Sequence, residues 1–388
     1  MTVTAPLGFR AAGVTAGLKA SGRSDVALVV NDGPLQSAAA VFTSNRFPAA
    51  PVLWSRQVVA DGELHAVILN SGGANACTGP EGFADTHRTA EHVAAALSAQ
   101  GREVGAGEIA VCSTGLIGER LPMDRLLTGV DDAIAGLTDE GGAEAAAAIM
   151  TTDTVPKVAV VRSGGFVVGG MAKGAGMLAP GLATMLVVIT TDAVAHPETL
   201  EAALTAATRV TFDRIDSDGC MSTNDTVIAM ASGAAMVQPT PTELAEAITA
   251  VCADLALQLI GDAEGASKDI AITVTHAGSE DDAVEVARAI ARSNLLKCAI
   301  HGEDPNWGRV LSAIGTTAAA FESDQVDVAI NDVWICRGGA AGEPRDLVDM
   351  SGRTVRITVD LSAGDAQATV WTNDLTADYV HENSAYST

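Results

Sequence analysis

The sequence predicts an α/β protein, of the layered α/β or α+β kind, whose sheets are covered by helices. Two observations predict it. Short apolar runs typical of strands alternate along the chain with longer stretches of helical periodicity. The 388 residues are 48% hydrophobic and 3% aromatic, which is enough to bury a large core in two domains or one two-lobed unit. The order of these elements does not by itself fix the topology.

The first half of the chain alternates between the two kinds of element. Short apolar runs predict strands at 27–30, 39–43, 65–70 and 108–112. Helical patterns occupy 84–100 and 123–136. This alternation of strands and helices is what favours layers of both kinds.

The second half continues with clearer signals. The run 185–190 is apolar and β-branched, which predicts a buried strand, and a helix is expected over 197–209 because a proline opens it. The strongest helix covers 243–260, with one apolar stripe along it formed by Leu244, Ile248, Val251, Leu255 and Leu259. The remaining predictions are strands at 226–232, 270–276 and 325–330, a helix at 281–293, and a late hairpin formed by 355–360 and 365–371.

Composition excludes several classes of function. A net charge of −25, with a pI near 4.4, repels phosphate backbones and anionic lipid surfaces, so we expect no nucleic acid or membrane partner. No apolar run approaches the ~18 residues of a membrane span, and the start of the chain lacks a basic segment followed by an apolar one. We therefore expect a cytoplasmic protein. The six cysteines are dispersed without a C-x-x-C pair and the histidines form no H-x-x-x-H pattern, so no metal site is expected.

The segment from Lys173 to Thr191 is the most informative part of the chain. Closely spaced glycines and a proline precede the predicted strand at 185–190, so Thr184 stands where a constrained loop enters rigid structure. If the Ala183–Thr184 bond is strained, the Thr184 hydroxyl can attack the preceding carbonyl and become a new N-terminus, nucleophile and base in one residue. Two alternatives remain open from these residues: a purely structural threonine, and a dinucleotide motif at 174–179, which matches G-x-G-x-x-A but is followed at once by a proline and a glycine.

Eight separated motifs, in order along nearly the whole chain, together resemble the ornithine acetyltransferases, also called glutamate N-acetyltransferases, of arginine biosynthesis. The motifs are ILNSGGANACTG (68–79), VCSTGLIG (111–118), IMTTDT (149–154), GGMAKGAG (169–176), LATM (182–185), STNDT (222–226), DPNWGR (304–309) and ENSA (382–385). The resemblance favours Thr184 as the nucleophile over both alternatives.

The resemblance implies a precursor that cleaves itself between Ala183 and Thr184 into an α chain, 1–183, and a β chain, 184–388, which stay associated, as an expected α2β2 heterotetramer. It implies sheets sandwiched between helices, in a fold distinct from that of the better-known N-terminal-nucleophile hydrolases. Within the β chain we expect 184–240 to complete the core, 241–345 to form a smaller α/β lobe, and 346–388 to return to the site.

The implied reaction moves an acetyl group from N2-acetylornithine to glutamate through an acetyl-Thr184 ester, by ping-pong chemistry without a cofactor. The resemblance assigns an oxyanion hole to Thr114 and Gly115, whose hydroxyl and backbone N–H are suitable donors. It assigns substrate contacts to Thr151, Lys173, Glu264, Asn383 and Thr388, with Thr152 as the alternative to Thr151. Taken alone, the Thr114–Gly115 pair reads as a turn, and the lysine and glutamate as surface charges.

Three questions stay open at this stage. A related self-processing aminopeptidase or amidase would pass the acyl group to water instead of an amine, and a non-catalytic binding protein would remain uncleaved. Acetyl-CoA is a possible further donor, which separates bifunctional from monofunctional members of the family. None of these alternatives is decided by the residues.

Overall fold

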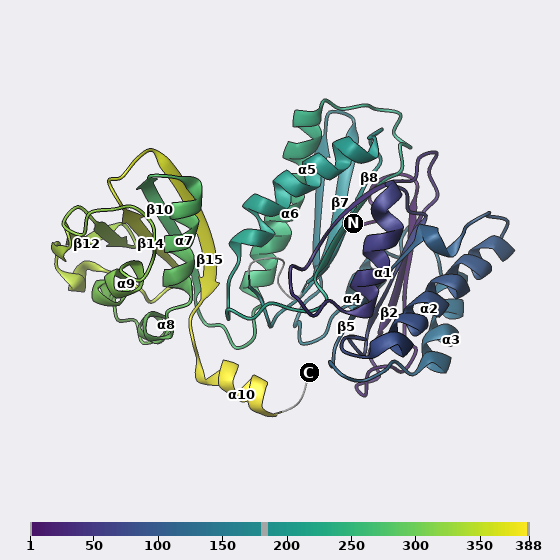
Figure 1. Ribbon diagram of the computed structural model, residues 1–388, viewed down its shortest axis with the longest axis horizontal. Coiled ribbons are helices and arrows are strands. Elements are labelled where there is room, and N and C mark those ends of the chain that lie inside the picture. Colours follow the sequence, from purple (N-terminus) through teal and green to yellow (C-terminus); the bar gives the residue numbers. More distant parts are fainter. Residues whose placement is uncertain (1, 180–184, 386–388) are drawn as a thin grey trace.

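The computed structural model describes residues 2–179 and 185–385. The larger body of this part has four layers: two helices, a five-stranded sheet, a four-stranded sheet and a second group of helices (Figure 1). Val188 and Ile228 of the five-stranded sheet belong to the hydrophobic cluster shared with the four-stranded sheet. Their neighbours Val187 and Val227 belong to a second cluster, with the helices over 197–210 and 241–261 that cover the other face of the five-stranded sheet. The expected arrangement of layered sheets sandwiched between helices is therefore confirmed.

The five-stranded sheet has the order β3-β9-β8-β7-β6. Strands β8 and β9 are parallel and buried along their whole length, which explains the continuous apolar run in β8. Strand β7 is antiparallel to β8, and Lys173 at its end lies opposite Leu186 at the start of β8. The strands are β3 (Ser37–Phe42), β6 (Lys157–Ser163), β7 (Phe166–Lys173), β8 (Leu186–Thr191) and β9 (Thr226–Ala231).

The four-stranded sheet has the order β1-β2-β4-β5. Strands β4 and β5 are parallel and joined by helix α2, so their carboxyl ends meet at one edge, where Ser71 pairs with Thr114. This edge is where the polar loops of the site begin. The strands are β1 (Phe9–Val14), β2 (Val26–Asn31), β4 (Ala66–Ser71) and β5 (Ile109–Thr114).

Two groups of helices cover the sheets. Helices α5 (Pro197–Val210) and α6 (Pro241–Gly261) pack on each other and on the five-stranded sheet. The four-stranded sheet is contacted by α1 (Ala50–Val58), α2 (Gly79–Ala99), α3 (Met123–Ala135) and α4 (Gly142–Ala148).

Helix α6 is long and apolar enough to cross a membrane, with a mean hydropathy of 1.6 over its most apolar window. It begins with Pro241 after a capping box between Thr240 and Glu243. Half of the window is buried, and the predicted apolar stripe, which includes Ile248 and Leu255, belongs to the core formed with α5, β6 and β7. Packing inside the protein accounts for this apolar stripe.

A third, six-stranded sheet forms a separate lobe (Figure 1), with the order β13-β12-β11-β14-β10-β15. Because α6 packs on the body, the lobe begins at Asp269 and includes strands up to Asn373, which differs from the expected span of 241–345. Its elements are β10 (Asp269–Ala277), α7 (Glu280–Ala291), α8 (Asn294–His301), α9 (Trp307–Ile314), β11 (Asp327–Ile330), β12 (Val333–Arg337), β13 (Ala340–Ala341), β14 (Thr354–Asp360) and β15 (Ala366–Asn373).

The late hairpin expected at 355–360 and 365–371 is wrong in its pairing. Both strands exist, as β14 and β15, but β10 lies between them, parallel to β14 and antiparallel to β15. Their connection passes the end of β10, where the amides of Ala363 and Gly364 donate to the carbonyl of His276 at 2.7 and 3.0 Å. The insertion of a strand from elsewhere in the chain cannot be read from a local pattern of two strands.

Candidate active site

Six of the residues that the resemblance assigns to the site line a single cleft. They are Thr114, Gly115, Thr151, Lys173, Glu264 and Asn383. They come from the ends of β5 and β7, from the loops after α4 and α6, and from the last helix, α10 (Ala377–Ala385). The cleft is completed by Ala74, Ile117, Thr152, Gly176, Met177, Ser222, Thr223 and Asn224. The remaining predicted residues, Ala183, Thr184 and Thr388, lie outside the described residues.

The expected oxyanion donors stand at the end of β5. Thr114 is the last residue of the strand and is 3% exposed, and Gly115 follows with a φ of +129°, where a side chain is strained. A Cβ on Gly115 would lie 2.7 Å from the amide nitrogen of Gly73, whose N–H donates to the Thr114 carbonyl at 3.1 Å. A glycine at position 115 therefore allows the two loops to pack closely and presents the Thr114–Gly115 pair to the cleft.

Asn224 holds this wall together and was missed from the sequence. Its side-chain Nδ2 donates to the carbonyls of Ala74 and Ser113, at 2.6 and 2.7 Å. It thereby joins the loop before β9 to the ends of β4 and β5. Its place within the motif 222–226 was visible, but its function as a bridge depends on contacts between distant segments.

Lys173 is a buried site residue, not a surface charge. Its side chain is 1% exposed, and its ammonium donates to the Thr114 hydroxyl oxygen at 3.1 Å. Burial lowers the pKa of Lys173, against the opposing effect of Asp153. Because the hydroxyl oxygen of Thr114 accepts from the lysine, its hydrogen is free to point to another acceptor, as an oxyanion donor requires.

A second missed residue, Asp153, connects several parts of the cleft. One carboxylate oxygen accepts from the Lys157 ammonium at 2.6 Å and from the Gly174 amide at 2.7 Å, and the other accepts from the Thr151 amide at 2.9 Å. Burial alone would raise the pKa of Asp153, but Lys173 and Lys157 outweigh it and lower the pKa to about 2. The carboxylate therefore stays charged and fixes the loops on both sides of the cleft.

Glu264 supplies the acidic group of the cleft. Its backbone N–H donates to the Ala175 carbonyl at 2.9 Å, and a Cβ on Gly176 would lie only 2.6 Å from the Glu264 carboxylate. The side-chain amide of Asn383 donates to the same carboxylate at 2.9 Å. Glu264 and Asn383 thus form one unit, beside the loop that follows Lys173.

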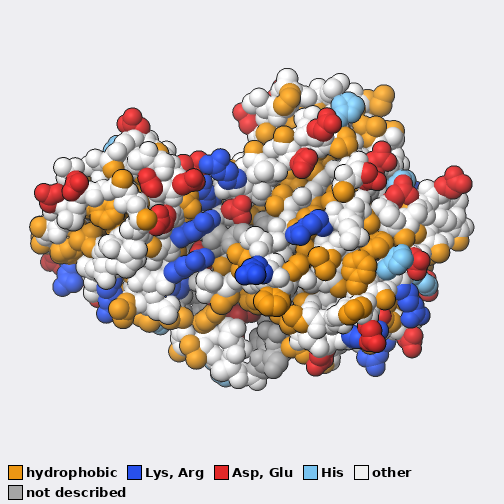
Figure 2. All heavy atoms as spheres, in the orientation of Figure 1, with side chains coloured by type: hydrophobic (Ala, Val, Ile, Leu, Met, Phe, Trp, Pro, Cys, Tyr) orange, Lys and Arg blue, Asp and Glu red, His pale blue; other side chains and the backbone are white. Residues whose placement is uncertain are grey.

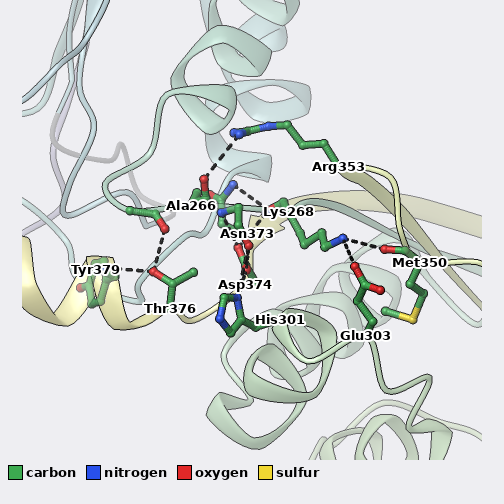
Figure 3. Close-up of polar contacts among 12 residues, drawn as sticks. Ala266, Lys268, His301, Glu303, Met350, Arg353, Asn373, Asp374, Thr376 and Tyr379 are labelled. Carbon is green, nitrogen blue, oxygen red and sulfur yellow. Dashed lines mark hydrogen bonds and ion pairs between the residues drawn. The ribbon is translucent and has the colours of Figure 1, made fainter.

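Helix α10 is attached next to Glu264 by the junction shown in Figure 3. The Thr376 hydroxyl donates to the Gly265 carbonyl at 2.7 Å and accepts from the Tyr379 amide at 3.0 Å. The Asp374 carboxylate accepts from the Lys268 amide at 2.8 Å. These bonds join the loop after α6 to the start of α10, and so bring Asn383 to the cleft.

The segment 180–184, which includes the expected nucleophile, lies outside the described residues, but the residues before and after it are fixed. The Met177 amide, at the cleft, donates to Asp218 at 2.7 Å. The Met185 amide donates to Asp225 at 3.0 Å, and burial raises the pKa of Asp225 well above its ordinary value. Strand β8 then begins opposite Lys173. Met177, three residues before the segment, thus lies at the cleft, and Met185, the first residue after it, lies at the end of the sheet where Lys173 stands.

The structure also bears on the possible dinucleotide motif. The possible dinucleotide motif at 174–179 opens no helix within its described residues, and β7 before it is antiparallel to both neighbouring strands, so the arrangement that binds a pyrophosphate is lacking there. Within residues 2–179 and 185–385, no group of three or more His, Cys, Asp or Glu side chains is placed to hold a metal ion.

Comparison with known proteins identifies the family. The chain matches the ArgJ family over residues 10–388. It is 68% identical over 387 residues to the "Arginine biosynthesis bifunctional protein ArgJ" of Streptomyces coelicolor and 65% identical over 388 residues to that of Thermobifida fusca, with 100% of both chains covered in each case. A crystal structure of ornithine acetyltransferase complexed with ornithine, from Mycobacterium tuberculosis, is 61% identical, covers 48% of this chain and 96% of its own, and has a TM-score of 0.44. The chain belongs to the ArgJ family.

Proposed function

We propose that the protein is a glutamate N-acetyltransferase of arginine biosynthesis, which moves the acetyl group of N2-acetyl-L-ornithine to L-glutamate through an acetyl-Thr184 ester. One observation carries the proposal: the Thr114–Gly115 pair, the Lys173 ammonium and the Glu264 carboxylate line one cleft, at the end of the sheet where β7 and β8 pair. A cation and an anion in the same cleft match the α-carboxylate and the amine of an amino-acid substrate.

The enzyme first prepares its own nucleophile. The Thr184 hydroxyl attacks the Ala183 carbonyl carbon, the C–N bond breaks as the ester forms, and the hydroxyl proton passes to the new amine. Hydrolysis of this ester leaves an α chain, 1–183, and a β chain, 184–388. The freed α-amino group, with an ordinary pKa of roughly 7.7–8.0, is then suited to accept the Thr184 proton at neutral pH.

In the transfer itself, the Thr184 hydroxyl attacks the acetyl carbonyl and ornithine leaves as the amine. The Thr114 hydroxyl and the Gly115 N–H stabilise the oxyanion of the tetrahedral intermediate. Lys173 binds the α-carboxylate and Glu264 the amine, with further substrate contacts from Thr151, Asn383 and Thr388. Glutamate then attacks the acetyl ester, which gives ping-pong kinetics.

The proposal also covers the need for a cofactor, a second acyl donor, the assembly of the chains and their location. Acyl transfer by this route needs no cofactor, and acetyl-CoA is a further donor if the protein shares the bifunctional activity named in its relatives. The α and β chains remain associated, as an α2β2 heterotetramer in the cytoplasm.

The test measures the acceptor and the donor in one set of assays. Purified protein is incubated with glutamate and either N2-acetylornithine or acetyl-CoA, and N-acetylglutamate and free acetate are both quantified. N-acetylglutamate from acetylornithine supports the proposal. Acetate without N-acetylglutamate would instead indicate a self-processing amidase or aminopeptidase. If neither acetate nor N-acetylglutamate forms, both the acetyltransferase and the amidase interpretations are contradicted.

A further inference from the structure

A buried carboxyl group bonds to the residue that directly follows the proposed nucleophile. Figure 2 shows acidic side chains spread over the face of the molecule that it draws, where water solvates them. Asp225 differs from these, because it is 0% exposed, immediately before strand β9. Its Oδ1 accepts from the Met185 amide at 3.0 Å, and Met185 follows Thr184 in the chain. A group that fixes the Met185 nitrogen therefore fixes the atom to which Thr184 is bonded.

Met185 is held on both sides by the same short segment. The Thr226 amide donates to the Met185 carbonyl at 3.1 Å, so residues 225 and 226 bind both the amide and the carbonyl of Met185. The next residue, Leu186, pairs with Thr226 where the parallel strands β8 and β9 begin. Met185 thus has a fixed position relative to the start of β9.

The same segment also reaches the expected oxyanion donors. Asn224, which lines the cleft, donates to the Ser113 carbonyl at 2.7 Å, and Ser113 directly precedes Thr114. The tripeptide 224–226 therefore connects the residue before the oxyanion donors with the residue after the nucleophile. Acyl transfer needs such a connection, because the attacking atom and the oxyanion donors must be aligned with each other.

The surroundings of Asp225 favour an uncharged carboxyl. Burial raises the pKa of Asp225 well above its ordinary value, although the Met185 amide, the charge of Lys173 and two nearby hydroxyls favour the ionised form. In the described part of the chain, the Oδ2 atom is closed to solvent and makes no hydrogen bond. An apolar side chain would avoid the cost of this unpaired oxygen, but it would leave the Met185 amide without its acceptor.

An uncharged acceptor also suits the chemistry that follows cleavage. The α-amino group freed on Thr184 acts as a base only when it has no proton. An ionised carboxylate bonded to the next residue would favour the protonated amine, and so would oppose this role. An uncharged carboxyl holds Met185 without that effect.

We propose that Asp225 is a positioning residue, which acts through the Met185 amide to hold Thr184 in place for self-cleavage and, opposite the Thr114–Gly115 pair, for acetyl transfer. The inference rests on the proposed function, in which Thr184 is the nucleophile. Because Asp225 bonds to Met185 rather than to a substrate, its loss should lower the rates of both reactions without lowering substrate affinity.

Two substitutions at Asp225 and one at the other end of β8 test the inference. Asp225→Ala removes the acceptor, whereas Asp225→Asn keeps an uncharged oxygen for the Met185 amide. The matched control is Asp192→Ala, since Asp192 is also buried and its carboxylate accepts from the amides of Leu7 and Val167 at 3.0 and 2.7 Å. Self-cleavage of the newly synthesised chains is followed on denaturing gels. The kcat and KM for N2-acetylornithine and glutamate are measured on processed protein, at a temperature where thermal melting shows every variant folded.

The expected results separate positioning from stability. Asp225→Ala should slow self-cleavage and lower kcat by at least about tenfold with little change in KM, since a misplaced nucleophile loses rate rather than binding. Asp225→Asn should retain most of both rates. Asp192→Ala should be less stable than the wild type but keep its kcat and its rate of self-cleavage. If Asp225→Ala fails to fold, Asp225→Ser replaces it, because its side chain is one bond shorter and leaves the Met185 amide without its acceptor.

Two results would overturn the inference. Rates in Asp225→Ala equal to those in Asp192→Ala would show that the carboxyl only stabilises the fold. Equal losses in Asp225→Ala and Asp225→Asn would show that the oxygen bound to Met185 is not the group that matters. If the wild type cleaves itself but transfers no acetyl group, the proposed function fails, and the cleavage rates alone still decide the role of Asp225. A wild type that does not cleave itself overturns both.

Discussion

At the scale of residues, the cleft depends on charges that hold one another in place. Lys173 touches Thr114, and Asp153 binds Lys157 and both loops that border the cleft. The resemblance predicts both the reacting groups and the substrate contacts, because the motifs mark their positions. The supporting groups, Asp153 and Asn224, lie in the same motifs, but a motif does not say which distant carbonyls or amides a side chain will bind.

The contribution of the Thr114 hydroxyl to turnover is directly measurable. Thr114→Ala removes a donor to the oxyanion, so turnover should fall by about 10² in processed enzyme, with little change in KM. Steady-state kinetics with N2-acetylornithine and glutamate provide the measurement. Thr128→Ala is the control, because that hydroxyl bonds only within helix α3. A twofold loss at Thr114 would make its hydroxyl structural.

The charge of Asp153 should stabilise the fold in a pH-dependent way. Its pKa is lowered to about 2 in the folded protein, so its contribution is complete above the ordinary value near 4 and is lost as the pH falls towards 2. Asp153→Asn removes the carboxylate that most favours the charged form of Lys173, whereas Lys157 keeps its second partner, Asp262, at 2.5 Å. The substitution should cost about 3 kcal/mol at pH 7, the lower end for a broken buried ion pair. Thermal melting should show a large deficit at pH 7 that narrows below pH 4. A deficit independent of pH would contradict this account.

At the scale of elements, local patterns predicted most strands and helices of the core but not their partners. The buried strand β8 and the capped helix α6 lie close to the expected ranges. The prediction that β14 and β15 form a hairpin was wrong, because β10 lies between them in the sheet. The role of the 304–309 motif could not be derived from the sequence; in the structure Asn306 caps helix α9, and its side chain accepts from the Arg309 amide.

Helix α10 offers a test of one element. A variant that ends at Glu382 lacks Asn383, which donates to Glu264, and the residues after it. Self-cleavage should persist, because the scissile bond is far away in the sequence, whereas substrate affinity should fall and acetate should leak as water reaches the acetyl ester. Gel analysis and an acetate assay check the two parts. Ser384→Ala in the full-length chain is the control, since that hydroxyl bonds within α10. Normal kinetics for both substrates in the truncated variant would remove Asn383 and Thr388 from the site.

At the scale of the whole molecule, the cleft is assembled from segments that are distant in the sequence. Thr114, Lys173, Glu264 and Asn383 come from two sheets, the loop after α6 and the last helix. Ordered motifs along the chain indicated that these residues belong to one site, whereas periodicity and composition indicated only covered sheets. The extent of the third lobe, 269–373, could not be predicted locally, since α6 could pack on either part.

We expect self-cleavage to be a property of the complete fold. The freshly purified protein should separate on a denaturing gel into two fragments of similar size, and the second should begin Thr-Met-Leu-Val. Thr184→Ala should remain a single chain, because the attacking hydroxyl is gone, while Thr184→Ser should retain some cleavage. N-terminal sequencing gives the position of the cut. An intact wild-type chain, or a cut at another bond, is incompatible with the mechanism.

The central claim is that Thr184 carries the acetyl group between donor and acceptor. Processed enzyme is mixed with N2-acetylornithine in the absence of glutamate, quenched, and examined by mass spectrometry of its fragments. The account predicts one acetyl group on the 184–388 fragment, located at Thr184 and lost when glutamate is added. An unmodified fragment, together with intersecting initial-rate plots, would contradict it and indicate direct transfer between the two substrates.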